Sequence, residues 1–118
     1  MKKAIEWYEL GVSRYPNSPL INKMKFDLAS AWYAIGESDR TGYTKALKGF
    51  QELRARVKGV DHRLEVESAF GEAETLEEVD RLEEAYALYS TINQDYPAPN
   101  VIQVRMMRLK ERMKKKRK

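Results

Sequence analysis

The chain has 118 residues, enough for one domain with a modest core but too few for two. Hydrophobic residues make up 42% and charged residues 34%, a balance typical of folded proteins, and no apolar run is long enough for a membrane helix. The net charge of +4 conceals an acidic middle and a basic end, while the lack of cysteine excludes disulfides, thiolate metal sites and a cysteine nucleophile.

The first half of the chain contains three helical patterns. The first begins near Ala4 and is expected to run to Tyr15-Pro16, where proline stops it. The second covers residues 20–35 with apolar side chains along one stripe, and Gly36 is suited to cap its end. The third is centred on Ala46 to Leu53 and follows a loop over residues 37–42.

The second half continues the alternation. Residues 62–79 form an apolar stripe with Asp61 as the expected N-cap, and the next helix contains Ala85 and is expected to run to Tyr96-Pro97. Residues 100–113 complete the helical domain, which we predict to span residues 1–113. A basic tail, predicted to be disordered, covers residues 114–118. No strand pattern competes, so the predicted fold class is all-α.

One pattern recurs in the first, third and fifth of these helices. Alanine is followed four residues later by an aromatic residue, as in Ala46 and Phe50, and the repeats are 42 and 39 residues apart. Residues 28–36 contain Leu28-Ala29-x-x-Trp32, similar to the Leu-Gly-x-x-Tyr pattern of tetratricopeptide repeats. The chain to about residue 112 therefore resembles the tetratricopeptide repeat (TPR) family, which implies an α-α superhelix, a solenoid of about three helix-turn-helix units.

Two departures accompany this resemblance. The spacing exceeds the family's usual length of about 34 residues, and the middle unit has Lys58-Gly59 where the family pattern has a closing proline. The longer spacing, the Tyr-Pro-Asn-Ser-Pro run at 15–19 and the last helix look similar to bacterial envelope members, including outer-membrane assembly lipoproteins and the periplasmic partner of the Tol-Pal system. The opening helix resembles the second helix of a unit, so we expect a fragment of a longer array or an apolar end that needs a cover.

The resemblance implies that partners bind in a concave groove lined by the first helix of each pair. Transferring that groove onto this sequence gives a set of aromatic, charged and small side chains: Lys23, Phe26, Ser30, Tyr33, Glu67, Phe70, Glu74, Glu77, Val104 and Arg108. Its glutamates favour a partner segment with Lys or Arg, and its aromatics would supply most of the affinity. The alternative is that Phe26 and Phe70 belong to the core and the glutamates form a solvated helix face.

The basic end offers a second function. Nine cations occur within residues 105–118 against Glu111, and the tail is Lys114, Lys115, Lys116, Arg117 and Lys118. Such a cluster can contact nucleic acid or an anionic membrane, and it resembles a nuclear import signal. It contains no aromatic residue, however, so we also consider a solubilising tail, or docking on the acidic residues 64–84 of a second copy, which would give a homo-oligomer.

Catalysis has little support in the sequence. The single histidine, His62, follows the expected N-cap and has no evident partner, and no phosphate-binding loop, nucleophile motif or metal-ligand spacing is present. We therefore predict a binding module that is not an enzyme, with no catalytic residues, metal or cofactor. The chain shows no signal peptide, and the envelope location is implied by the resemblance alone.

Overall fold

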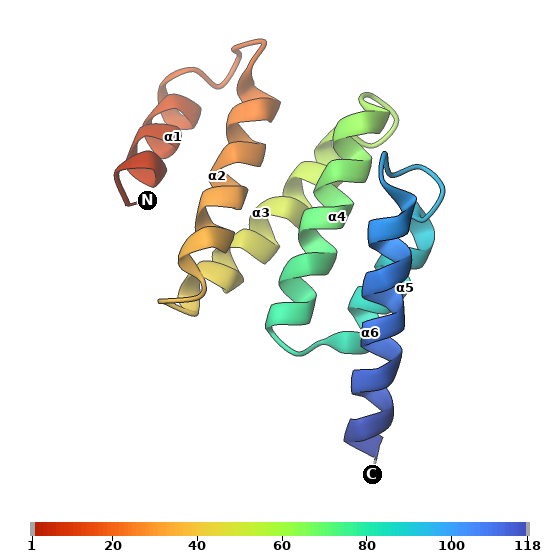
Figure 1. Ribbon diagram of the computed structural model, residues 1–118. Helices are drawn as coiled ribbons and strands as arrows, with labels where there is room; N and C mark the ends of the chain where they lie inside the picture. The colour runs from red at the N-terminus through yellow and green to blue at the C-terminus, as the bar shows by residue number, and fades with distance from the viewer. Residues whose placement is uncertain (1, 118) are drawn as a thin grey trace.

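The computed structural model describes residues 2–117, with side chains through Lys116. This part of the chain forms six helices and no strand: α1 (Lys2–Arg14), α2 (Ile21–Ile35), α3 (Thr41–Val57), α4 (His62–Glu78), α5 (Leu82–Ile92) and α6 (Pro99–Arg117). Successive helices run in alternating directions and pack on their neighbours in chain order (Figure 1). The predicted all-α fold, an α-α superhelix of stacked helices, is confirmed.

The stacking gives an elongated molecule. Its principal extents are 50 × 32 × 19 Å and its radius of gyration is 14.8 Å, against about 13.5 Å for a compact domain of this length. Helices α2, α4 and α6 run in the same direction and line the near side in Figure 1, with α3 and α5 behind them. Across the described residues, no helix combines the length and the apolar character that crossing a membrane requires.

The core is built from the repeated alanine and aromatic positions. Ala46 and Phe50 in α3, and Ala85 and Tyr89 in α5, are buried. The largest cluster joins α4, α5 and α6, where a small residue on one helix lets a neighbouring helix approach closely. Helix α1 contributes less, because Ile5 is its single buried side chain.

The expected end of the fifth helix is wrong. Helix α5 ends at Ile92 and does not reach Pro97. The chain turns after Ile92, whose carbonyl oxygen accepts hydrogen bonds from the backbone N–H groups of Asp95 and Tyr96. This turn carries Tyr96 back onto Phe70, where the two rings stack with centroids 4.4 Å apart. Pro97 therefore lies in the connection between helices.

Helix α6 extends past residue 113, where we predicted the helical domain to end. Helix α6 continues through Arg117, with Pro99 at its first position, where the missing N–H costs nothing. The last turns are held by contacts with the connection between α4 and α5, where Asp80 forms ion pairs with Arg112 at 3.4 Å and with Lys116. Lys118 lies outside the described residues. Residues 114–117 of the basic segment thus continue α6.

Helix α4 begins with the predicted cap. Asp61 has extended backbone angles, and its Oδ1 accepts the Leu64 N–H at 3.0 Å. Replacing Asp61 by alanine leaves that N–H without its partner, so we expect the free energy of unfolding to fall by about 1 kcal/mol. Urea unfolding followed by circular dichroism measures this. Asp95→Ala is the control: Asp95 makes an exposed contact with His62 at 3.8 Å, and its loss should cost under about 0.5 kcal/mol.

Candidate functional site

The predicted binding residues lie on α2, α4 and α6. We call this side the α2/α4/α6 face and define it by the ten residues predicted for the groove. Helix α2 contacts α4, and Arg105 connects α6 to α4. The structure therefore places the three helices that carry the predicted residues side by side.

On α2, the predicted residues differ in exposure. Lys23 is exposed and forms an ion pair with Asp27 at 3.6 Å, while Ser30 is partly exposed. Phe26 packs edge-on against Phe50, with ring centroids 5.7 Å apart, so half of this side chain belongs to the core. The structure thus packs Phe26 partly against the core and leaves part of its side chain accessible, while its predicted role in binding stays a prediction.

Phe70 joins three elements. Its ring stacks on Tyr96, meets the Tyr89 ring edge-on at 5.7 Å, and has the Arg105 guanidinium 5.2 Å from its centre. Such contacts hold an aromatic ring in one orientation. Phe70 is therefore a fixed, half-buried part of the face.

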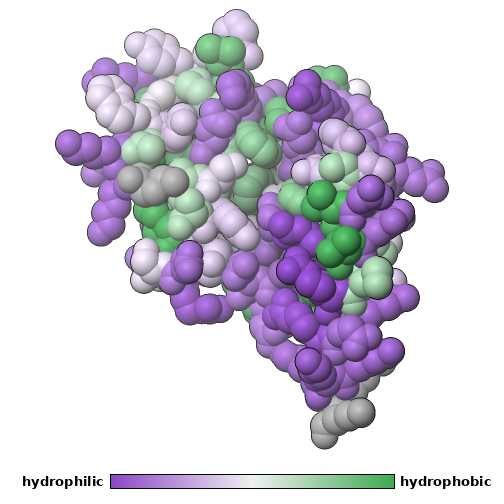
Figure 2. Space-filling model, viewed as in Figure 1, coloured by the Kyte–Doolittle hydropathy of each residue, from purple (hydrophilic) through white to green (hydrophobic). Residues whose placement is uncertain are grey.

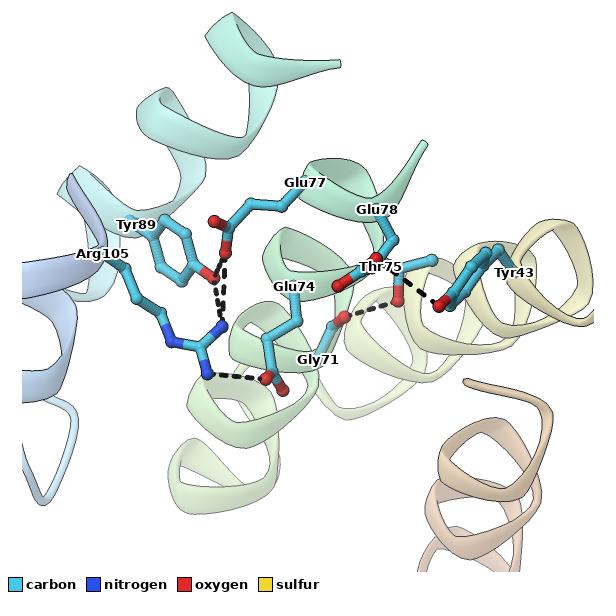
Figure 3. Close-up of polar contacts among 8 residues, drawn as sticks. All are labelled: Tyr43, Gly71, Glu74, Thr75, Glu77, Glu78, Tyr89 and Arg105. Carbon is cyan, nitrogen blue, oxygen red and sulfur yellow. Dashed lines mark hydrogen bonds and ion pairs between the residues drawn. The ribbon is translucent and has the colours of Figure 1, made fainter. Parts of the chain in front are cut away.

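Arg105 is the centre of the polar network on this face (Figure 3). Its guanidinium forms an ion pair with Glu74 at 3.0 Å and another with Glu77 at 3.3 Å, and it donates to the Tyr89 oxygen at 3.4 Å. Tyr89 in turn donates to the Glu77 carboxylate. Four side chains from α4, α5 and α6 are thus joined in one hydrogen-bonded group, in which the nearly buried Glu77 has two partners.

The network changes the ionisation of its members. Burial alone would lower the pKa of the Arg105 guanidinium, but the contacts with Tyr89 and the charges of Glu74 and Glu77 raise it above its ordinary value. Burial raises the pKa of Tyr89, and the adjacent Glu77 raises it further. Burial also raises the pKa of the Glu74 carboxyl, and Arg105 opposes this in part. Arg105 therefore stays charged and Tyr89 stays neutral.

Sequence reasoning did not select Arg105 as a site residue. A usable signal was present, because Arg105 lies between Ile102 and Leu109, in the stripe that α6 buries. A cation within a buried stripe needs a buried acceptor, and the segment that forms α4 is rich in glutamate. What the sequence lacks is the distance between the helices.

Tyr33 connects α2 to the acidic side of α4. Its ring meets the Tyr43 ring edge-on at 5.6 Å, and the Tyr43 hydroxyl donates to Glu78 at 3.5 Å. Burial raises the pKa of Tyr33, and the charges of Glu74 and Glu78 raise it further. The negative charge of Glu74 on α4 therefore acts on Tyr33 on α2.

The buried and partly buried tyrosines should ionise at higher pH in the folded chain than in the unfolded chain. Burial raises the pKa of Tyr33, Tyr43, Tyr89 and Tyr96 above 10.0. The fold favours the neutral phenol, so this contribution to stability is complete below the unfolded pKa of about 10 and is lost as the pH rises above it. At about pH 10.5 the folded protein should show less phenolate absorbance at 295 nm than the urea-unfolded chain. Identical titration curves would contradict this.

The glutamates of the face already have cationic partners. Glu67 pairs with Arg63 at 3.1 Å, and Glu74 and Glu77 share Arg105. Asp27 pairs with Lys23. Three cations thus face these four acids, which removes most of the negative charge that the sequence suggested for a basic partner and leaves one charge over.

The cations of α6 divide into two groups. Five are engaged within the chain: Arg105, Lys110 over the Tyr86 ring, Arg112, Lys114 with Glu111, and Lys116. Arg108 and Lys115 have no such partner among the described side chains. The side chains of Arg117 and Lys118 lie outside the described residues.

Exposed apolar side chains accompany the free cations. Val101, Val104 and Met107 are 40%, 55% and 68% exposed at three-residue spacing. Val101 and Arg108 flank Arg105 at helical distances of four and three residues, so they border the side of α6 that faces α4. Figure 2 shows green, apolar atoms over α6 among purple, hydrophilic ones. Helix α6 thus presents an apolar stripe that continues into a basic one.

A separate cleft lies between α3, α4 and α5. It has a volume of about 450 Å³, and its lining includes Arg54, Lys58 and His62. Arg54 is engaged with the buried Glu72 at 2.8 Å, and His62 is mostly exposed. Within the part of the chain that the structure describes, no group of three or more His, Cys, Asp or Glu side chains is placed to hold a metal ion.

Comparison with known proteins adds no family. No protein-family model matches the chain, and neither the curated proteins nor the solved structures contain a match. The resemblance to the TPR family and to its bacterial envelope members therefore stays a prediction. The case for function rests on the α2/α4/α6 face itself.

Proposed function

We propose that this chain is a protein-interaction module, not an enzyme, and that it binds a segment of another protein on the α2/α4/α6 face. The observation that carries the proposal is the run of exposed Val101, Val104 and Met107 along α6, in which Val104 belongs to the face and Val101 and Met107 adjoin it. Three large apolar side chains in one stripe are costly to leave in water and are typical of a surface that another chain covers.

The surroundings of the stripe support the same function. The Arg105 network and the stack of Phe70 on Tyr96 fix the position of α6 against α4 and α5. A fixed surface loses little conformational entropy when a partner binds, which favours affinity. The resemblance to tetratricopeptide repeats implies binding through the same helices.

The second predicted function, binding of nucleic acid or an anionic membrane through the basic end, has weaker support. Five of its nine cations are engaged within the chain, and Arg108 and Lys115 are the described ones left free. Phosphate-dependent binding depends on many cations acting together.

The test is co-purification from a native lysate with three baits: wild type, Val104→Lys and Val60→Lys. Val60 is also an exposed valine but lies in the turn before α4, so it provides the same substitution away from the face. We expect mass spectrometry to identify proteins that wild type and Val60→Lys retain and Val104→Lys loses, while circular dichroism shows equal helix content. Retention of the same proteins by all three baits would contradict the proposal.

A further inference from the structure

We infer that the segment bound along α6 is an acidic amphipathic helix of another protein, whose apolar side chains cover Val101, Val104 and Met107 and whose carboxylates pair with Arg108 and Lys115. This inference rests on the proposed function and specifies the chemistry of the partner. It also reverses the charge that the sequence favours for that partner.

The ion pairs within the fold indicate the sign of the charge that the partner must carry. Asp27, Glu67, Glu74 and Glu77 each have a cation within 3.6 Å, so they offer little to a basic partner. A basic segment would have to displace those cations. Arg108 and Lys115, by contrast, are exposed and have no acidic partner among the described residues. The charge left unmatched beside the apolar stripe is therefore positive.

The shape of the stripe favours a helix as its occupant. From Val101 to Lys115 the stripe follows one side of α6 for about 21 Å, which is the length of a straight helix of about 14 residues. Val101, Val104 and Arg108 follow one another at three and four residues, and Lys115 lies seven residues, or two helical turns, further on, with Glu111 between them paired to Lys114. A second helix matches this spacing with side chains at the same intervals. The apolar end at Val101 and the basic end at Lys115 also define the order of apolar and acidic residues along the partner.

A second copy of this chain fits the stripe poorly. Its most exposed apolar helix face is on α1, where Trp7 and Leu10 lie among Lys3, Glu6 and Arg14, a set with a net positive charge. Packing that face on α6 would bring cations against Arg108 and Lys115. The glutamates that face α6 or α2 on α4 are paired within their own chain, so they do not provide the alternative acidic surface.

A phosphate surface also fits poorly. Nucleic acid and anionic lipid would satisfy Arg108 and Lys115, but the apolar groups of duplex DNA are the thymine methyls, which are too few and scattered to cover the valine stripe. Helices that bind an anionic bilayer insert Trp, Phe or Leu, whereas the exposed apolar side chains of α6 are Val101, Val104 and Met107. Binding to single strands relies on exposed aromatic rings, and the exposed side chains of α6 include none. An acidic helix satisfies the apolar and the basic parts together.

The test selects binders without assuming their sequence. A phage-displayed library of random 16-residue peptides is panned against the full chain, and enriched peptides are synthesised and measured by fluorescence anisotropy. We expect the enriched peptides to be acidic and to carry apolar residues at helical spacing. The double variant Arg108→Glu, Lys115→Glu should bind them at least tenfold more weakly than wild type. The control double variant Lys48→Glu, Lys58→Glu makes the same change in net charge on α3 and at the residue that follows it, away from the stripe, and should leave affinity within twofold.

The other outcomes separate this inference from the proposed function. Enriched peptides that are neutral or basic, lost with Val104→Lys but unaffected by Arg108→Glu, Lys115→Glu, would overturn the acidic partner and leave the protein-binding function standing. If no peptide is enriched while a 20-base-pair DNA duplex or phosphatidylglycerol vesicles bind, both proposals are wrong. Binding of fluorescent wild-type chain by unlabelled chain, lost with Arg108→Glu, Lys115→Glu, would assign the stripe to a second copy.

Discussion

Replacing Gly42 by alanine is expected to lower the free energy of unfolding by about 3 kcal/mol, near the upper end of the range for overpacking. An added Cβ would lie 2.6 Å from the Trp32 carbonyl oxygen and 2.9 Å from the Gly36 nitrogen. Both atoms belong to the backbone of the α2 end, so no side chain can rotate away. Helices α2 and α3 would have to separate, which urea unfolding followed by circular dichroism would report.

Gly11→Ala is the matched control within a helix. Its added Cβ would meet the Met24 sulfur at 3.0 Å, at the flexible end of a side chain that can move aside. Alanine also favours a helix interior over glycine by about 1 kcal/mol. We expect Gly11→Ala to be neutral or stabilising. Equal losses at Gly11 and Gly42 would show that backbone crowding is not the cause.

Replacing Arg105 by alanine is also expected to lower the free energy of unfolding strongly. It leaves the nearly buried Glu77 with Tyr89 alone, removes the cation beside Glu74, and removes the contact with the Phe70 ring. Removing one member of a buried ion pair costs about 3–5 kcal/mol, and the partial exposure of Arg105 places our expectation at about 3 kcal/mol. Chemical denaturation measures this loss.

Arg112→Ala supplies the comparison on the same helix. Arg112 and its partner Asp80 are about half exposed and 3.4 Å apart. Solvent screens such a pair, so its loss should cost under about 1 kcal/mol. A loss for Arg105→Ala as small as that for Arg112→Ala would mean that the network contributes little to stability. The pair of variants thus separates a buried charge from a surface one.

The fold was predictable because its signals are local. The spacing of Ala46 and Phe50, repeated in Ala85 and Tyr89, marks buried helix faces, and Asp61 caps α4 as its position implies. The end of α5 was not predictable from Pro97. It depends on Tyr96 reaching Phe70, a contact between residues far apart in the sequence.

The candidate site was predictable in its location more than in its chemistry. The sequence placed Tyr33, Glu74 and Arg108 on helices that do lie side by side. It could not show that Arg105 holds Glu74 and Glu77, because pairing depends on distances between helices. Periodicity assigns a residue to a face, whereas the net charge of that face is set by which side chains meet.

Neighbour-to-neighbour stacking also implies uneven dynamics along the molecule. Helix α1 packs on α2 and buries only Ile5, while α4 has close packing on both sides and α6 adds Ile102 and Leu109 to the same cluster. Amide hydrogens of α1 should consequently exchange with solvent through local opening, and those of α4 only through opening of the whole fold. The molecule would then loosen from its N-terminal end while the α2/α4/α6 face, on which binding is proposed, keeps its shape.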